Sequence, residues 1–217
     1  MASEYTNDPK RPGGLRRKTY NPLVWVIDSD LRVSAESLSH KYLDKTITGL
    51  CAVLLNARLY AVKGIRNKRG LDYALASPEK HEFLESVAKG LATASFTPTL
   101  IQPAHRVTKW ARKCQENYSY FKDYLEKCMA EWNARGYPEH GKDELAALLI
   151  VSPNPRRLPF SRRPVALEWK VLPPRYRQKD VIGGMRKYYC SRIKDPLKEY
   201  ADCARGVPPF FNTTYVV

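Results

Sequence analysis

The strongest constraint on the fold is a helical spacing of residues in the middle of the chain. Seven positions recur at intervals of four, three, four, four, three and four residues, and they are Trp110, Cys114, Asn117, Phe121, Leu125, Cys128 and Trp132. Side chains spaced in this way lie on one face of an α-helix. The pattern therefore predicts one long, half-buried helix, which Gly136 and Pro138 bring to an end.

A second helix is predicted nearer the N-terminus. Its buried face would consist of Leu43, Ile47, Leu50 and Leu54. Ser34 is the expected N-cap, and the helix should run to about Arg58. Residues 22–28, which precede this helix, contain an unbroken apolar run that predicts a short buried strand.

Three shorter helices are predicted in the rest of the chain. They are expected over residues 78–92, residues 142–151 and residues 181–193, and Asp180 is in position to cap the last of them. A chain of 217 residues is long enough for one domain with a sizeable core. The pattern as a whole favours a mainly α fold with little or no sheet.

The expected domain organisation is simple. Residues 1–21 are rich in basic residues, Pro and Gly, and they predict a flexible basic arm. A compact single helical domain should cover residues 22–200, followed by a C-terminal tail over residues 201–217. Nucleic-acid binding is assigned to the helical domain, with help from the arm.

The charge of the protein indicates its partners. Lys and Arg number 37 against 22 Asp and Glu, which gives a formal net charge of +15. Such a surface attracts polyanions, and nucleic acid is the expected partner. A membrane is not expected, because the chain has no apolar run of about 18 residues and no apolar signal segment. No protein partner is indicated, and we expect the protein in a cytoplasm-like compartment.

Cysteines and nucleotide motifs point to no cofactor. The five cysteines are scattered without a Cys-x-x-Cys pair, so no metal site is expected and most of them should pack as small core residues. The chain has no phosphate-binding loop, dinucleotide fingerprint or His-Glu-x-x-His motif. Zinc chemistry and nucleotide hydrolysis therefore have no support in the sequence.

Four groups of residues are candidate nucleic-acid contacts. The first lies in the arm and consists of Arg16, Arg17 and Lys18. The second is the pair Lys41 and Lys45, which share one face of a predicted helix. The third enters the long helix, where backbone N–H groups also favour phosphate, and consists of His105, Arg106, Lys109 and Arg112. The last mixes cations with a ring that can stack on bases, and consists of Arg175, Arg177, Arg186, Lys187 and Tyr188.

Each group also has a purely structural interpretation. The arm can be a solvated tail, and the charges near Trp110 can be solvated while the tryptophan itself packs in the core. Tyrosines at helical spacing are often core residues with the hydroxyl at the rim. A protein scaffold whose charge only maintains solubility is a further alternative, which a lack of nucleic-acid binding would favour.

Three stretches of the chain carry a family resemblance. Residues 105–121 read His-Arg-Val-Thr-Lys-Trp-Ala-Arg-Lys-Cys-Gln-Glu-Asn-Tyr-Ser-Tyr-Phe, residues 186–189 read Arg-Lys-Tyr-Tyr, and residues 39–45 read Ser-His-Lys-Tyr-Leu-Asp-Lys. The first resembles the His-Pro-x-Thr-Lys-Trp-x-Arg-x-Ser-x-x-Asn-Tyr-x-Trp helix of the phage-encoded pyrimidine-dimer DNA glycosylases of the endonuclease V type. The second is similar to that family's closing Tyr-Arg-x-Tyr-Tyr element, and the third to its first basic helix.

The resemblance implies a compact helical fold that binds nucleic acid, in a phage protein acting in the cytoplasm of a bacterial host cell. In the best-known member, an N-terminal amine attacks the sugar and a glutamate assists. Here residues 1–21 precede the first predicted element, and Gly49 stands where relatives carry the glutamate. We therefore expect a member without catalysis that binds RNA or DNA largely independently of sequence. The alternative is an active DNA glycosylase or AP lyase, with Lys41 or Lys45 as the amine and Asp44 as the carboxylate.

Overall fold

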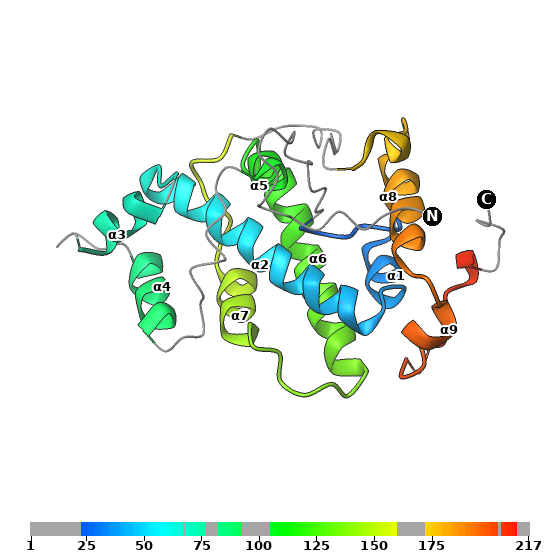
Figure 1. Ribbon diagram of the computed structural model, residues 1–217. Helices are drawn as coiled ribbons and strands as arrows, with labels where there is room; N and C mark the ends of the chain where they lie inside the picture. Colours follow the sequence, from blue (N-terminus) through cyan, green and yellow to red (C-terminus); the bar gives the residue numbers. More distant parts are fainter. Residues whose placement is uncertain are drawn as a thin grey trace, which may run out of the picture.

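Two long helices, α2 (His40–Lys63) and α6 (Gln115–Ala134), pack against each other at the centre of the molecule (Figure 1). The computed structural model describes residues 23–66, 68–76, 82–92, 105–159, 172–203 and 205–211. Three shorter helices contact the central pair, and they are α1 (Leu31–Glu36), α5 (Arg106–Ala111) and α7 (Asp143–Val151). The mainly α fold is therefore confirmed, and no strand occurs in the described ranges.

The remaining elements lie toward the two ends of the central pair (Figure 1). They are α3 (Lys68–Ala76), α4 (Glu82–Ala92), α8 (Val181–Arg192), α9 (Pro196–Glu199) and two short 3-10 turns, η2 (Pro174–Tyr176) and η3 (Pro209–Phe211). α3 packs on α4, and α8 packs on η2. The sequence predicted α7 and α8 closely but did not predict α3.

The prediction of a strand over residues 22–28 is wrong for the residues that the structure describes there, 23–28. Val24, Trp25, Val26 and Ile27 are buried as expected, but they form no ladder. Side chains satisfy the backbone instead, because the Tyr124 hydroxyl donates to the Trp25 carbonyl at 2.6 Å and Arg186 Nε donates to the Ile27 carbonyl at 2.7 Å. A buried backbone needs hydrogen-bond partners, and here the helices supply them.

The predicted helix from Ser34 to Arg58 is two helices. Asp30 caps α1, since its Oδ1 accepts from the Arg32 and Val33 amides, and the chain turns before α2 begins after Ser39. Ser34 is not the cap: its Oγ accepts from the Ile27 amide at 2.9 Å. The serine was a suitable residue for a cap, but a distant backbone group uses its hydroxyl.

The long central helix also contains a break that its apolar spacing did not predict. α5 ends at Ala111 and α6 begins after Cys114, which is extended. The Asn117 side chain donates to the Trp110 carbonyl at 2.9 Å, and the Gln115 amide donates to the Pro159 carbonyl at 2.9 Å. The second bond satisfies an N–H group that the start of α6 leaves open, while the Trp110 carbonyl also accepts from the Lys113 amide at 3.1 Å.

Gly49 lies where the N-terminal segment crosses α2. A Cβ atom at this position would lie 1.7 Å from the Leu23 carbonyl oxygen. No side chain fits there, so the glutamate that the resemblance places at this position has no room in this fold. The glycine is required by packing.

Part of the tail expected after residue 200 joins the core. Arg205 Nε and Nη2 both donate to the Glu131 carboxylate at 3.1 Å, and Arg135 Nε donates to the same carboxylate at 2.7 Å. The Tyr200 hydroxyl donates to the Ser37 carbonyl at 2.7 Å. These bonds connect the segment around residues 200–205 to α6 and to the end of α1.

None of the helices in the described ranges is both long enough and apolar enough to cross a membrane. Cys51, Cys114 and Cys128 are buried with reduced thiols, as expected for core residues. Among the described side chains, no group of three or more His, Cys, Asp and Glu residues could hold a metal ion.

Candidate nucleic-acid interface

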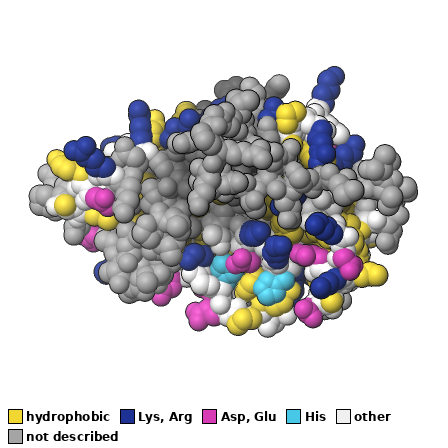
Figure 2. Space-filling view, in the orientation of Figure 1, with side chains coloured by type: hydrophobic (Ala, Val, Ile, Leu, Met, Phe, Trp, Pro, Cys, Tyr) yellow, Lys and Arg dark blue, Asp and Glu magenta, His cyan; other side chains and the backbone are white. Residues whose placement is uncertain are grey.

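Lys and Arg side chains are spread over the face in Figure 2, and in its lower middle they lie beside Asp, Glu and His side chains. Lys41 and Lys45 lie one turn apart at the start of α2, and both side chains are exposed. Their ammonium groups lie 5.8 Å and 5.3 Å from the centroid of the Tyr42 ring. Two lysines therefore lie over one buried aromatic ring, an arrangement that a cation–π attraction favours.

Arg192, near the end of α8, is the third cation at this ring. Burial raises the pKa of Tyr42, and the Arg192 guanidinium beside its hydroxyl opposes that rise. We call Lys41, Lys45 and Arg192 the Tyr42 cation cluster. Partial burial, together with the charges of Lys41 and Arg192, lowers the pKa of Lys45. The cluster thus brings together cations from two helices that are far apart in the sequence, with Asp44 and Glu199 as acidic neighbours.

A row of aromatic rings continues from this cluster. Trp25 meets Tyr42 edge-on at 5.1 Å and stacks on Tyr188 at 5.5 Å, between ring centroids. Tyr188 contacts Tyr176 at 5.0 Å, and the Arg175 guanidinium lies 4.7 Å from the Tyr176 centroid. Of the residues that the sequence singled out, Arg175 is exposed, whereas Tyr188 is buried against Trp25, as its structural interpretation allowed.

Asp44 has a buried partner that sequence reasoning missed. His140 Nε2 lies 2.9 Å from Asp44 Oδ1, and His140 Nδ1 accepts from the Lys142 amide at 3.2 Å. Because Nδ1 is an acceptor, the ring proton lies on Nε2 and is donated to Asp44. The His140 side chain is 4% exposed, whereas that of Asp44 is 51% exposed. A rigid imidazole thus orients a carboxylate that faces solvent.

The hydrogen bond from His140 lowers the pKa of Asp44. Asp44 and Lys45 are adjacent in the chain, so an ionised carboxylate lies next to an amine of lowered pKa. His140 follows α6 in the chain, 96 residues after Asp44. Trp132 packs edge-on against the His140 ring at 4.8 Å. No local sequence signal could have identified this pair.

The group at residues 105–112 lies at the opposite end of α2. His105 Nδ1 accepts from the Val107 amide at 3.3 Å and so caps α5. Arg106 and Lys109 are exposed on α5. The Arg112 guanidinium lies 4.3 Å from the centroid of Tyr60, in the last turns of α2. These residues form a second basic region, separate from the Tyr42 cation cluster.

Two candidate cations have structural roles within the fold. Arg186 Nη2 pairs with Asp28 Oδ2 at 2.7 Å, in addition to its bond to the backbone before α1. Arg177 Nε donates to the Leu172 carbonyl at 2.8 Å. Lys187 is half-buried on α8. Their contact with nucleic acid stays a prediction, while Arg16, Arg17 and Lys18 lie outside the described residues.

Comparison of the chain with protein-family models, curated proteins and solved structures gave no match. The resemblance to the pyrimidine-dimer glycosylases therefore depends on the three motifs alone. The structure bears on the fold class alone, which is mainly helical. Function has to be inferred from the side chains that the fold brings together.

Proposed function

We propose that the protein binds nucleic acid through the Tyr42 cation cluster and through Arg175 and Tyr176 at the end of the aromatic row. The observation that carries the proposal is the convergence of Lys41, Lys45 and Arg192 around one ring. Burial is the largest cause of the lowered pKa of Lys45, and the charges of Lys41 and Arg192 add to it, so an anionic ligand would stabilise these cations. Phosphate groups supply that charge, and a net charge of +15 draws a polyanion toward the protein.

The half-buried Tyr176 favours nucleic acid over other polyanions. Its ring lies beside the exposed Arg175, whereas Trp25, Tyr42 and Tyr188 are buried and belong to the core. Cations suit phosphates, and a partly exposed ring suits a base or a sugar. Binding of this kind depends little on sequence, as we expect for RNA or DNA held by a phage protein.

Two double variants, each of which removes two positive charges, test the proposal. The double variant Lys41→Gln, Lys45→Gln removes two charges from the cluster. Its control, Lys113→Gln with Lys127→Gln, removes two charges from exposed positions elsewhere. In anisotropy titrations with a labelled oligonucleotide, the cluster variant should lower the salt slope of binding by about 2, and the control by less. Equal effects of the two pairs would contradict a localised site.

The Asp44–His140 pair favours one second candidate, an AP lyase that acts through a Schiff base. An unprotonated amine is needed for attack on a sugar aldehyde, and partial burial lowers the pKa of Lys45 in that direction. Asp44, oriented by His140, would then accept the proton. We favour binding without catalysis, because Lys45 is exposed and Gly49 leaves no room for a glutamate.

Borohydride trapping on abasic-site DNA separates the two functions. Binding alone predicts no covalent adduct. The variant Lys45→Arg keeps the positive charge but cannot form a Schiff base. An adduct that forms with the natural protein and disappears in Lys45→Arg, while binding persists, would establish the lyase.

A further inference from the structure

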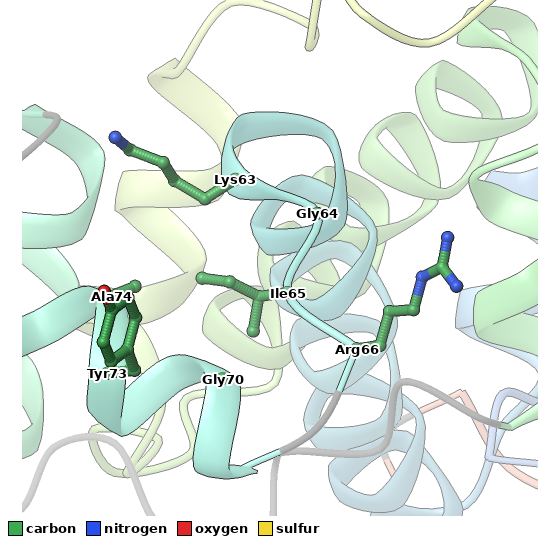
Figure 3. A pocket seen from close by; sticks show the side chains of 7 residues that line it. All are labelled: Lys63, Gly64, Ile65, Arg66, Gly70, Tyr73 and Ala74. Atoms are coloured by element: carbon green, nitrogen blue, oxygen red, sulfur yellow. The ribbon is translucent and has the colours of Figure 1, made fainter.

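A hollow at the far end of α2 has no role in the fold or in the Tyr42 cation cluster. It measures about 370 Å³ and lies between the end of α2 and α3 (Figure 3). Gly64 ends α2 in a left-handed conformation with φ of 66°, and the chain then turns back toward α3. Small-molecule sites have volumes of about 300–1,000 Å³, so the hollow is large enough for a single ring system.

The walls of the hollow suit a flat, apolar group. Ile65 and Ala74 are buried and form its apolar floor. Tyr73 stands at its side on α3, and 82% of this residue is exposed. A tyrosine ring exposed to this degree gains nothing from the core, but it offers a face for stacking. We call this hollow the Tyr73 pocket.

Cations border the same pocket. Lys63 and Arg66 line it, and their side chains extend outward in opposite directions (Figure 3), with the Arg66 guanidinium 5.6 Å from the Tyr60 centroid. Arg157 also reaches this end of α2, where its Nη1 donates to the Val62 carbonyl at 3.0 Å. A ligand that fits here combines a flat ring with negative charge on either side of it, and a nucleotide within a strand has that chemistry.

We propose that the Tyr73 pocket receives one unpaired base of a single-stranded nucleic acid, which stacks on Tyr73 while Lys63 and Arg66 contact the flanking phosphates. This inference rests on the proposed function and specifies its substrate class. Bases in a duplex are already stacked and paired, so only an unpaired base can enter. Stacking on an aromatic ring tolerates every base, in agreement with binding that depends little on sequence.

Two strands with the same backbone test the proposal. One is a short oligothymidylate. The other has the same number of phosphates but carries a tetrahydrofuran spacer at each position, so it has no bases. Tyr73→Ala should weaken binding of the oligothymidylate about ten-fold and leave binding of the spacer strand unchanged. Tyr73→Phe, which keeps the ring, should bind both strands as the natural protein does. Lys63→Gln with Arg66→Gln should weaken both.

A control variant and the results that would contradict the proposal complete this test. Val151 is an exposed apolar residue on α7, and Val151→Ala should change neither affinity. An unchanged affinity of Tyr73→Ala for the oligothymidylate, or an equal loss on both strands, overturns the pocket and leaves the proposed function standing. Failure of the natural protein to bind either strand overturns both.

Discussion

At Gly49 a single hydrogen atom in place of a side chain allows the N-terminal segment to cross α2. The Leu23 carbonyl oxygen occupies the space that a Cβ atom would need. The same segment carries Trp25, which joins Tyr42 to Tyr188 in the aromatic row. One glycine thus connects the packing of the core to the geometry of the candidate interface.

Gly49→Ala should destabilise the protein by about 1–3 kcal/mol or more, because overpacking forces the backbone apart. In an open helix the same change would stabilise by about 1 kcal/mol, so the sign of the effect is diagnostic. Urea unfolding measures it. Gly141→Ala is the control, since a Cβ atom there has no heavy atom within 4 Å. A stabilised Gly49→Ala variant would contradict the crossing.

Asp44 predicts how stability depends on pH. The hydrogen bond from His140 lowers the pKa of Asp44 below its ordinary value of 3.8. A carboxyl with a lowered pKa in the folded state stabilises the protein above its unfolded pKa, and this contribution is lost as the pH falls through the folded pKa. Asp44→Asn should therefore lose less stability than the natural protein below about pH 4 in unfolding measurements. Identical acid profiles would contradict this role of His140.

At the scale of elements, the short helix α5 carries a buried aromatic residue on one face and an exposed cation on another. Trp110 is buried, and its ring meets Phe121 at 4.9 Å. Lys109, its neighbour on α5, is exposed. Arg112 is half-buried, and its guanidinium lies 4.3 Å from the centroid of the Tyr60 ring.

The loss of unfolding free energy on substitution should decrease from Trp110 to Arg112 to Lys109. Trp110→Ala should lower the free energy of unfolding by about 3–5 kcal/mol, as large-to-small core changes do. Arg112→Ala should cost about 0.5–1 kcal/mol through the lost contact with Tyr60. Lys109→Ala should change stability by less than about 0.5 kcal/mol. Thermal or urea unfolding of the three variants checks the order, and a larger loss at Lys109 than at Trp110 would mean that α5 presents the opposite face.

At the scale of the whole molecule, the positive charge is distributed over more than one region. The Tyr42 cation cluster lies at the start of α2, and Lys63 and Arg66 lie at its far end. From Lys45 to Lys63 the helix rises about 27 Å, at 1.5 Å per residue. A strand that reaches both regions therefore contacts several phosphates.

Nucleic-acid affinity should fall steeply with salt. Several phosphate contacts release several counterions, so the slope of log K against log salt should be about −3 or steeper. Deleting residues 1–18 should flatten this slope without lowering the melting temperature, because the segment is polar and basic. A slope near zero in titrations would contradict the electrostatic account. Loss of thermal stability on deletion would show that the segment belongs to the core.

The sequence by itself determined the helical class, the buried faces of α2 and α6, and the basic character of the surface. Leu43, Ile47, Leu50 and Leu54 are all buried, as their spacing predicted. Periodicity succeeds here because side chains three and four residues apart share a face whatever the rest of the chain does. The candidate lysines 41 and 45 followed from the same rule.

Only the tertiary structure decided where helices break and which side chains meet. Tyr124 and Arg186 satisfy the backbone of the segment that was predicted as a strand, and both are distant from it in the sequence. His140 reaches Asp44 across 96 residues, and Arg192 reaches Tyr42 from α8. Such partners depend on how the helices pack against one another, whereas helical periodicity depends only on residues within a few positions of each other.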